Sequence, residues 1–392
     1  MNLATVIPIL ERLVAFDTTS SNSNLELIHW VANYLDGHGI KAFVQLGDEA
    51  GKANLFATIG PQDRAGVMLA GHSDVVPVAG EVWTSEPFKL TERNGNLYGR
   101  GSADMKAFIA CMTAMVPNFV AAKLTKPVHL ALSYNEETNM GGMRRLAAYL
   151  ANAPIKPLAC IIGEPTSMNV IVANKGAAIF KVEIDGKAVH SSLRDQGVSA
   201  VEIAAEVIVF LNALQRHLNG GLRHDGFEFP HTSVHVGRIS GGTAHNITAR
   251  HCEFVFEVRA LPGMRAADVA QRVRDYCHQT LLPPMRAVSA ECNIRIEEVL
   301  DAPGLDERGN TYLARALMPL CAHSVIGRVS FGTEAGMLQD IGVPTIVCGP
   351  GQIKVAHQPD EFVEIEQLDR CVQFLHALTG RLEQGSWPGK LS

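Results

Sequence analysis

Five side chains of the types that bind metal ions are spread along this 392-residue chain, each in a short motif rich in glycine, proline or acidic residues. Two are imidazoles and three are carboxylates, a set that can hold two divalent ions if one carboxylate bridges them. Paired divalent ions of this kind promote hydrolysis. The five residues are His72, Asp104, Glu137, Glu164 and His357, and a further carboxylate, Glu136, stands beside them.

Two neighbouring features suggest how such a site would work. A histidine that binds zinc needs a partner on its other ring nitrogen, and Asp74 lies two residues after His72, on the same side if the strand continues. The adjacent acids Glu136 and Glu137 point in different directions, so one could bind metal while the other faces an attacking water. The alternative is a solvated acidic loop, which the apolar run just before the pair disfavours.

The first half of the chain alternates strand and helix patterns, as expected of an α/β layer fold. Helical spacing is found at residues 7–16, 25–35, 104–116 and 141–152. Strands buried on both faces are predicted by the short apolar runs at residues 53–57, 66–70, 128–132 and 158–162. Ligands of open α/β sheets gather outside the carboxyl ends of the strands. Since His72, Glu136 and Glu164 each lie at or just after the end of such a run, we expect the sheet to bring them to one edge.

The pattern changes at Lys175. The order from there is β-α-β-β-α-β, with strands at 177–184, 232–239, 252–258 and 294–299 and helices at 197–218 and 265–280. This order predicts an inserted, ferredoxin-like α+β domain. Helix and strand patterns alternate again after Pro303. We therefore expect a discontinuous catalytic domain, residues 1–174 and 300–392, with a mixed and mostly parallel sheet covered by helices on both faces, and a second domain at residues 175–299.

Composition narrows the class of protein. A hydrophobic content of 47% is ample for two cores in a chain of this length. The net charge of −6, with dispersed lysines and arginines, provides no basic face for nucleic acid. Eight cysteines without a Cys-x-x-Cys pair suggest buried free thiols. No apolar run is long enough to span a membrane and the start of the chain lacks the basic region of a secretory signal, so we expect a cytoplasmic protein.

The five motifs, in this order, resemble those of the M20 family of co-catalytic zinc aminoacylases and peptidases over essentially the whole chain. The resemblance implies that all five residues ligate two zinc ions, with Asp104 bridging them, although such a ligand set also accepts cobalt or manganese. It further implies that Glu136 is the general base and that the inserted domain is a lid through which two copies of the chain form a homodimer. The matching motifs are Gly71-His72-Ser73-Asp74, Gly101-Ser102-Ala103-Asp104-Met105-Lys106, Asn135-Glu136-Glu137-Thr138, Gly163-Glu164-Pro165-Thr166 and Ala356-His357-Gln358-Pro359-Asp360.

Segments at residues 71–78, 332–336, 348–351 and 356–362 most resemble the branch of this family that deacetylates N2-acetyl-L-ornithine. That resemblance implies release of L-ornithine and acetate, a step of arginine biosynthesis, from a small N-acyl amino acid. Two alternatives of the same family stay open, a succinyl-diaminopimelate desuccinylase and a general aminoacylase. A more distant alternative is a binding protein that keeps the fold without catalysis.

The resemblance also assigns residues outside the metal set. His190 matches a histidine that reaches into the partner subunit's site and steadies the oxyanion; otherwise it is a surface histidine at a strand end. Arg259 matches a residue that grips the substrate, and its two-pronged guanidinium suits an α-carboxylate, although a strand salt bridge would also explain it. Asn246 matches another substrate contact. Gly332 and Thr333 match a loop that offers backbone and hydroxyl groups to the substrate, with a plain turn as the alternative.

Overall fold

The computed structural model describes residues 3–321, 325–385 and 387, which form two compact units. Unit 1 takes its residues from Met1–Ala173, Leu305–Arg328 and Thr333–Ser392. Unit 2 comprises Asn174–Gly304 and Val329–Gly332. The chain therefore leaves unit 1 after the first of these segments and returns to it twice.

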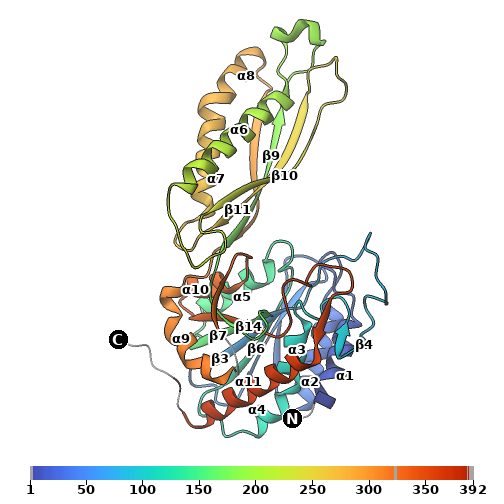
Figure 1. Cartoon of the computed structure of the whole chain (residues 1–392), viewed down its shortest axis with the longest axis vertical. Coiled ribbons are helices and arrows are strands. Elements are labelled where there is room, and N and C mark those ends of the chain that lie inside the picture. Colours follow the sequence, from blue (N-terminus) through green and yellow to red (C-terminus); the bar gives the residue numbers. More distant parts are fainter. Residues whose placement is uncertain (1–2, 322–324, 386, 388–392) are drawn as a thin grey trace. The chain divides into compact units, whose positions relative to one another are not determined.

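Unit 1 is built on an eight-stranded mixed sheet with the strand order β1-β2-β6-β3-β7-β14-β8-β13 (Figure 1). The four central strands, β6, β3, β7 and β14, are parallel, whereas β1 pairs antiparallel with β2, β2 with β6, and β8 with β14. The predicted α/β class with a mixed sheet is confirmed, and its parallel part is the centre of the sheet. The strands are β1 (Ala42–Leu46), β2 (Ala53–Ile59), β3 (Val67–His72), β6 (Val128–Ser133), β7 (Ala159–Pro165), β8 (Val170–Asn174), β13 (Ile326–Val329) and β14 (Thr345–Gly349).

Helices cover both faces of this sheet, because the side chains of its buried central strands alternate between two apolar layers. In β3, Leu69 belongs to the hydrophobic core cluster that the sheet forms with α1, α2, α3, α9 and α11. Its neighbours Met68 and Ala70 are also buried but lie outside that cluster. On the other side α5 contacts β2 and β6, and α10 contacts β14. The helices are α1 (Leu3–Val14), α2 (Leu25–Gly37), α3 (Lys106–Ala114), α4 (Val116–Ala121), α5 (Gly141–Ala151), α9 (Thr311–Leu317), α10 (Ala335–Asp340) and α11 (Ile365–Glu383).

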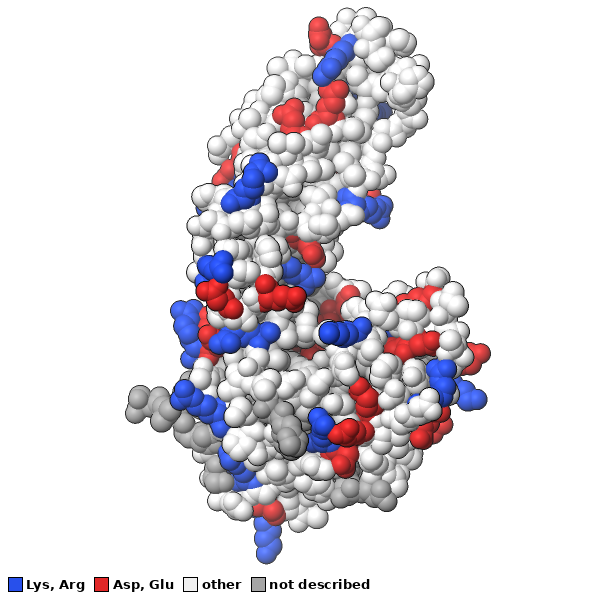
Figure 2. Space-filling model, in the orientation of Figure 1, with Lys and Arg blue, Asp and Glu red and all other residues white. Residues whose placement is uncertain are grey.

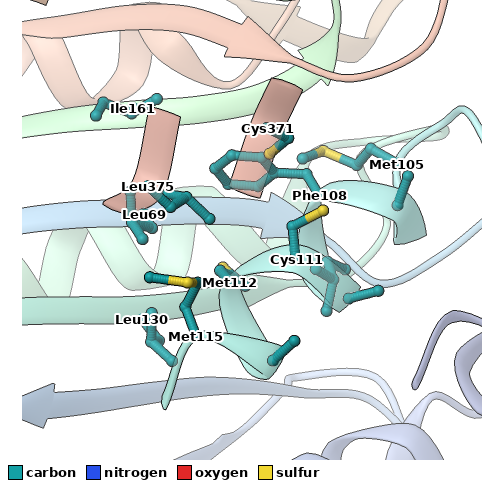
Figure 3. Packing of buried hydrophobic residues seen from close by; sticks show 14 of the residues in the cluster. Leu69, Met105, Phe108, Cys111, Met112, Met115, Leu130, Ile161, Cys371 and Leu375 are labelled. Carbon is teal, nitrogen blue, oxygen red and sulfur yellow. The ribbon is translucent and has the colours of Figure 1, made fainter. Parts of the chain in front are cut away.

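Helix α3 is buried along its whole length and forms the centre of the core (Figure 3). Its side chains pack between strand residues such as Leu69 and Ile161 and the α11 residue Cys371. A Cβ atom at Gly163 of β7 would lie 1.9 Å from Cγ of Phe108, so only glycine lets α3 approach the strand this closely. The sequence predicts one helix over 104–116; the structure has α3 and α4, because Pro117 lacks the N–H that would continue the first helix.

A small three-stranded sheet brings two distant loops of unit 1 together. Its strands are β4 (Thr91–Arg93), β5 (Asn96–Tyr98) and β15 (Phe362–Glu364), in the order β15-β5-β4. Because Phe362 pairs with Tyr98, the residue before β15 lies opposite the residue after β5. The N–H of Gly99 accordingly donates to the carbonyl of Glu361 at 2.9 Å.

Unit 2 has the predicted order β-α-β-β-α-β, with the second helix divided into α7 and α8 by a π-helical segment, Cys277–Leu281, and an antiparallel four-stranded sheet, β10-β11-β9-β12. Its central strands β9 and β11 alternate buried and more exposed residues, so one face carries a core with stacked rings such as Phe180 and Phe256. The ferredoxin-like prediction is confirmed for this unit. Its elements are β9 (Gly176–Asp185), α6 (Ala200–Asn219), β10 (Ser233–Gly241), β11 (His251–Ala260), α7 (Ala266–Tyr276), α8 (Leu282–Val288) and β12 (Asn293–Ala302).

The surface carries charges of both signs. Lysines and arginines are interspersed with acidic residues on the face drawn in Figure 2. Among the helices of the described residues, none combines the length and apolarity needed to cross a bilayer. All eight cysteines are buried free thiols.

Candidate metal centre

Three neighbouring parallel strands deliver metal-binding side chains to one edge of the unit 1 sheet. His72 is the last residue of β3, Glu164 lies near the end of β7, and Glu136 and Glu137 follow β6. Two loops complete the group: Asp104 lies just before α3, and His357 lies in the turn that precedes β15. His357 has φ of 59°, a left-handed conformation that is uncommon outside glycine and that is often found at functional sites.

Asp104 lies between the two imidazoles. Its Oδ1 is 3.1 Å from Nε2 of His72, and its Oδ2 is 3.3 Å from Nε2 of His357. Glu164 Oε1 is 3.8 Å from the same nitrogen of His72, and Glu137 Oε1 is 3.0 Å from that of His357. The five residues thus form two groups that share Asp104, which is the arrangement required of a carboxylate that bridges two ions.

The electrostatics of this cluster are those of a cation site. Burial raises the pKa of Glu164 well above its ordinary value, and the charge of Asp104 raises it further. Burial alone would lower the pKa of His72, but the carboxylates of Glu164 and Asp104 together raise it well above its usual value. His357, whose side chain is 48% exposed, has its pKa raised to about 10 by hydrogen bonds to Asp104 and Glu137.

The residues present fit a pair of divalent ions. Glu164 Oε1 is buried and has no hydrogen-bond partner among the described residues, as expected of an oxygen reserved for a ligand. Nitrogen and carboxylate donors in this proportion suit zinc, cobalt or manganese. Within the described part of the chain, all three groups of side chains that could hold an ion lie in this cluster.

Asp74 forms hydrogen bonds that hold His72, Glu136 and Glu137 in place. The Nδ1 atom of His72 is 2.9 Å from the backbone carbonyl of Asp74 and 3.7 Å from its carboxylate, so the carbonyl takes the position expected of the carboxylate. The carboxylate instead accepts hydrogen bonds from the backbone N–H groups of Glu136 and Glu137, at 3.1 and 3.3 Å, and from the hydroxyl of Ser20 at 2.6 Å. This single side chain therefore fixes the loop that carries both glutamates.

The position of Glu136 is compatible with two roles, metal ligand and general base. It is half-buried beside Glu137, and one potential ion-binding group consists of His72, Glu136 and Glu137. Burial raises the pKa of Glu136 well above its usual value, and Glu137 adds to the shift. A carboxylate with a raised pKa accepts protons more readily, so the position suits a general base as well as a ligand.

Four of the residues expected at the substrate lie in unit 2. His190 is exposed, with Nδ1 at 2.8 Å from the hydroxyl of Ser192, and the carbonyl of Asn246 accepts the N–H of Ser191. Arg259 on β11 donates to Glu257 at 3.1 Å, and a Cβ at Gly332 would lie 3.7 Å from Nη1 of Arg259.

Thr333 lies in unit 1, beyond the point where the chain leaves unit 2. It is buried, and its hydroxyl accepts the N–H of Ala335 at the start of α10.

The structure adds residues that the sequence did not single out. Glu334 is fully buried, accepts a hydrogen bond from Ser133, and has its pKa raised by burial to about 7. Arg100 and Glu361 form a buried ion pair beside Asp104. The sequence carries a signal for both members of the pair. Arg100 stands between two glycines just before the Asp104 motif, and Glu361 directly follows the His357 motif. The sequence does not show that the two side chains meet.

Comparisons with known proteins give the family. A sequence profile of Peptidase family M20/M25/M40 matches residues 68–381. An acetylornithine deacetylase of Proteus mirabilis is 35% identical over 373 residues, which cover 93% of each chain. An acetylornithine deacetylase of Pasteurella multocida is also 35% identical, over 95% of this chain and 97% of the relative.

Solved structures share the fold at lower sequence identity. An M20 family metallo-carboxypeptidase from Sulfolobus solfataricus has a TM-score of 0.74 at 13% identity and covers 98% of this chain and 100% of its own. A dinuclear metal binding peptidase of the M20 family from Bacillus subtilis has a TM-score of 0.65 at 15% identity, covering 98% and 99%. The chain therefore belongs to Peptidase family M20/M25/M40 and is a metal-dependent amide hydrolase.

Proposed function

We propose that this protein hydrolyses N2-acetyl-L-ornithine to L-ornithine and acetate at a two-zinc centre, a reaction of arginine biosynthesis. The placement of Asp104 between His72 and His357 carries the proposal of a two-metal hydrolase. The choice of substrate is supported by 35% identity, over nearly the whole chain, to relatives named acetylornithine deacetylase.

His72 and Glu164 would hold one ion, Glu137 and His357 the other, and Asp104 both. Bound there, two divalent ions would supply Lewis acidity and bring the pKa of a water molecule towards neutrality. Cobalt or manganese could replace zinc at this donor set.

Glu136 moves the proton in this scheme. Its carboxylate accepts a proton from the attacking water and then delivers it to the amine nitrogen that leaves with ornithine. Asp74 holds the Glu136 backbone in place through the 3.1 Å hydrogen bond to its N–H. Burial raises the pKa of Glu136 well above its usual value, which favours uptake of the proton from water.

Residues outside the metal set would recognise the substrate. The guanidinium of Arg259 offers two parallel donors to the α-carboxylate, with Asn246, Gly332 and Thr333 contributing further contacts. His190 would stabilise the oxyanion from a second subunit, which makes the working protein a homodimer. Eight free thiols agree with a reducing, cytoplasmic environment.

A panel of three substrates tests the proposal. The zinc-loaded protein is assayed side by side on N2-acetyl-L-ornithine, N-succinyl-diaminopimelate and N-acetyl-L-methionine. We expect the highest kcat/KM for N2-acetyl-L-ornithine, because a pocket that matches this substrate gains binding energy from both its α-carboxylate and its side-chain ammonium. A higher kcat/KM for either of the other two would replace the substrate assignment while leaving the amidohydrolase assignment in place.

A further inference from the structure

Glu361 binds the backbone of the loop that carries Asp104. Its Oε1 accepts the N–H groups of Ala103 at 2.9 Å and Asp104 at 3.0 Å, and its Oε2 accepts the N–H of Gly101 at 3.0 Å. The Glu361 side chain is 1% exposed. A buried carboxylate that receives three backbone donors fixes the path of that backbone, because a buried donor left unpaired loses its hydrogen bond without gaining one to water.

Arg100 completes the arrangement from the other side. Its Nη1 donates to Glu361 Oε2 at 2.8 Å and to the carbonyl of Gln358 at 3.2 Å. Its Nη2 donates to Glu81 at 2.6 Å, and the guanidinium lies 5.0 Å from the ring centre of Trp83. Gln358 directly follows His357, so Arg100 connects the Asp104 loop with the loop of the second histidine.

The small sheet explains why these groups meet. Pairing of β15 with β5 places Glu361 opposite Gly99, at the start of the segment that leads to Asp104. The pairing sets the register of the two loops, and the carboxylate of Glu361 then fixes the last residues before the ligand. Asp74 does the same for the loop of Glu136 and Glu137, so two of the ligand loops are each held by a buried carboxylate.

We propose that Glu361, held by Arg100, is a positioning residue that sets the orientation of the Asp104 carboxylate between the two metal sites. Glu361 belongs to none of the groups of described side chains that could hold an ion. Its effect passes through the backbone of residues 101–104, whose last member presents one oxygen to each histidine. Since Asp104 is shared by the group with His72 and Glu164 and the group with Glu137 and His357, disturbing this loop should weaken both sites together. The proposal rests on the two-metal centre but not on the identity of the substrate.

The test measures zinc binding by the full-length protein. Glu361→Gln keeps the size of the side chain but turns one acceptor oxygen into an amide that faces backbone N–H groups. We expect both zinc dissociation constants, measured by competition with a chromophoric chelator, to rise about 10- to 100-fold, the range found for residues that orient metal ligands. The visible spectrum of the cobalt-substituted protein, which reports coordination geometry, should change as well.

A matched control distinguishes the hydrogen bonds between Glu361 and the Asp104 loop from the neutralisation of the charge on Arg100. Glu81→Gln removes the other carboxylate on the same guanidinium without touching the Asp104 loop, so its zinc affinities should stay within about twofold of the wild type. Thermal unfolding of each metal-free variant shows whether it is folded. If Glu361→Gln does not fold, Glu361→Asp keeps the charge but retracts it by one methylene, and it is expected to weaken both sites in the same way.

The outcomes distinguish the two proposals. A folded Glu361→Gln protein that binds two zinc ions with wild-type affinity overturns the positioning role, and so does weakening of only one site. A wild-type protein that binds no zinc overturns the metal centre itself. Weakening of both sites in Glu361→Gln, with little change in Glu81→Gln, supports the positioning role whether or not N2-acetyl-L-ornithine is the substrate.

Discussion

Replacing Glu136 with glutamine should separate proton transfer from metal binding. The change keeps the side-chain shape, and the backbone N–H of residue 136 still donates to Asp74, so the loop should not move. General acid–base groups contribute 10²–10⁴-fold to rate, and each factor of ten corresponds to about 1.4 kcal/mol. We therefore expect kcat for acetate release to fall by about 10²–10⁴-fold, which is about 3–5 kcal/mol of transition-state stabilisation.

Metal content provides the second measurement. Glu136→Gln should retain two zinc ions per chain by elemental analysis, whereas the neighbouring Glu137→Gln should lose affinity at the site of His357, to which Glu137 lies at 3.0 Å. A near-native rate for Glu136→Gln would refute its assignment as the base. Loss of an ion from Glu136→Gln would show that it is a ligand, as the alternative group of His72, Glu136 and Glu137 allows.

Three further outcomes follow from the same structure. Mixing inactive Glu136→Ala and His190→Ala proteins should restore part of the activity, since one site of a heterodimer would hold both intact residues; no recovery despite measured subunit exchange would argue against the trans role. Burial lowers the pKa of His129 to about 4, so as the pH falls from about 6.5 to 4 the unfolded state binds the proton more readily and about 3 kcal/mol of stability is lost. Urea unfolding of the metal-free proteins should therefore show a weaker pH dependence of the unfolding free energy in His129→Phe than in the wild type. An equal pH dependence in the two proteins would contradict this. Gly163→Ala places a methyl group 1.9 Å from Phe108, and it should lower the free energy of unfolding by about 3 kcal/mol, whereas a neutral effect would mean that α3 can move away from β7.

The central strands of unit 1 could be predicted because their burial on both faces gives continuous apolar runs. Strands β3 and β6, for example, are buried along their whole length. The flanking strand β1 escaped prediction because it mixes half-buried and exposed residues, and β4, β5 and β15 have only three residues each. Such short strands depend on tertiary contacts rather than on local pattern.

The residue types of the candidate centre are visible in the sequence, because two histidines and several acids recur at the ends of apolar runs. The structure brings all five side chains together, and their role as ligands stays a prediction. What local sequence does not reveal is the support behind them. Glu361 is more than 250 positions from the backbone N–H groups it accepts, and their meeting depends on the pairing of β15 with β5.

The most direct test of the two-metal deacetylase is a titration of activity with metal. The protein is stripped with a chelator, zinc is added from zero to two equivalents per chain, and acetate and L-ornithine released from N2-acetyl-L-ornithine are both measured. We expect no turnover without metal, and equal amounts of the two products once zinc is bound. A protein that binds two zinc ions at the candidate centre, yet releases no acetate from this substrate, would contradict the proposed function.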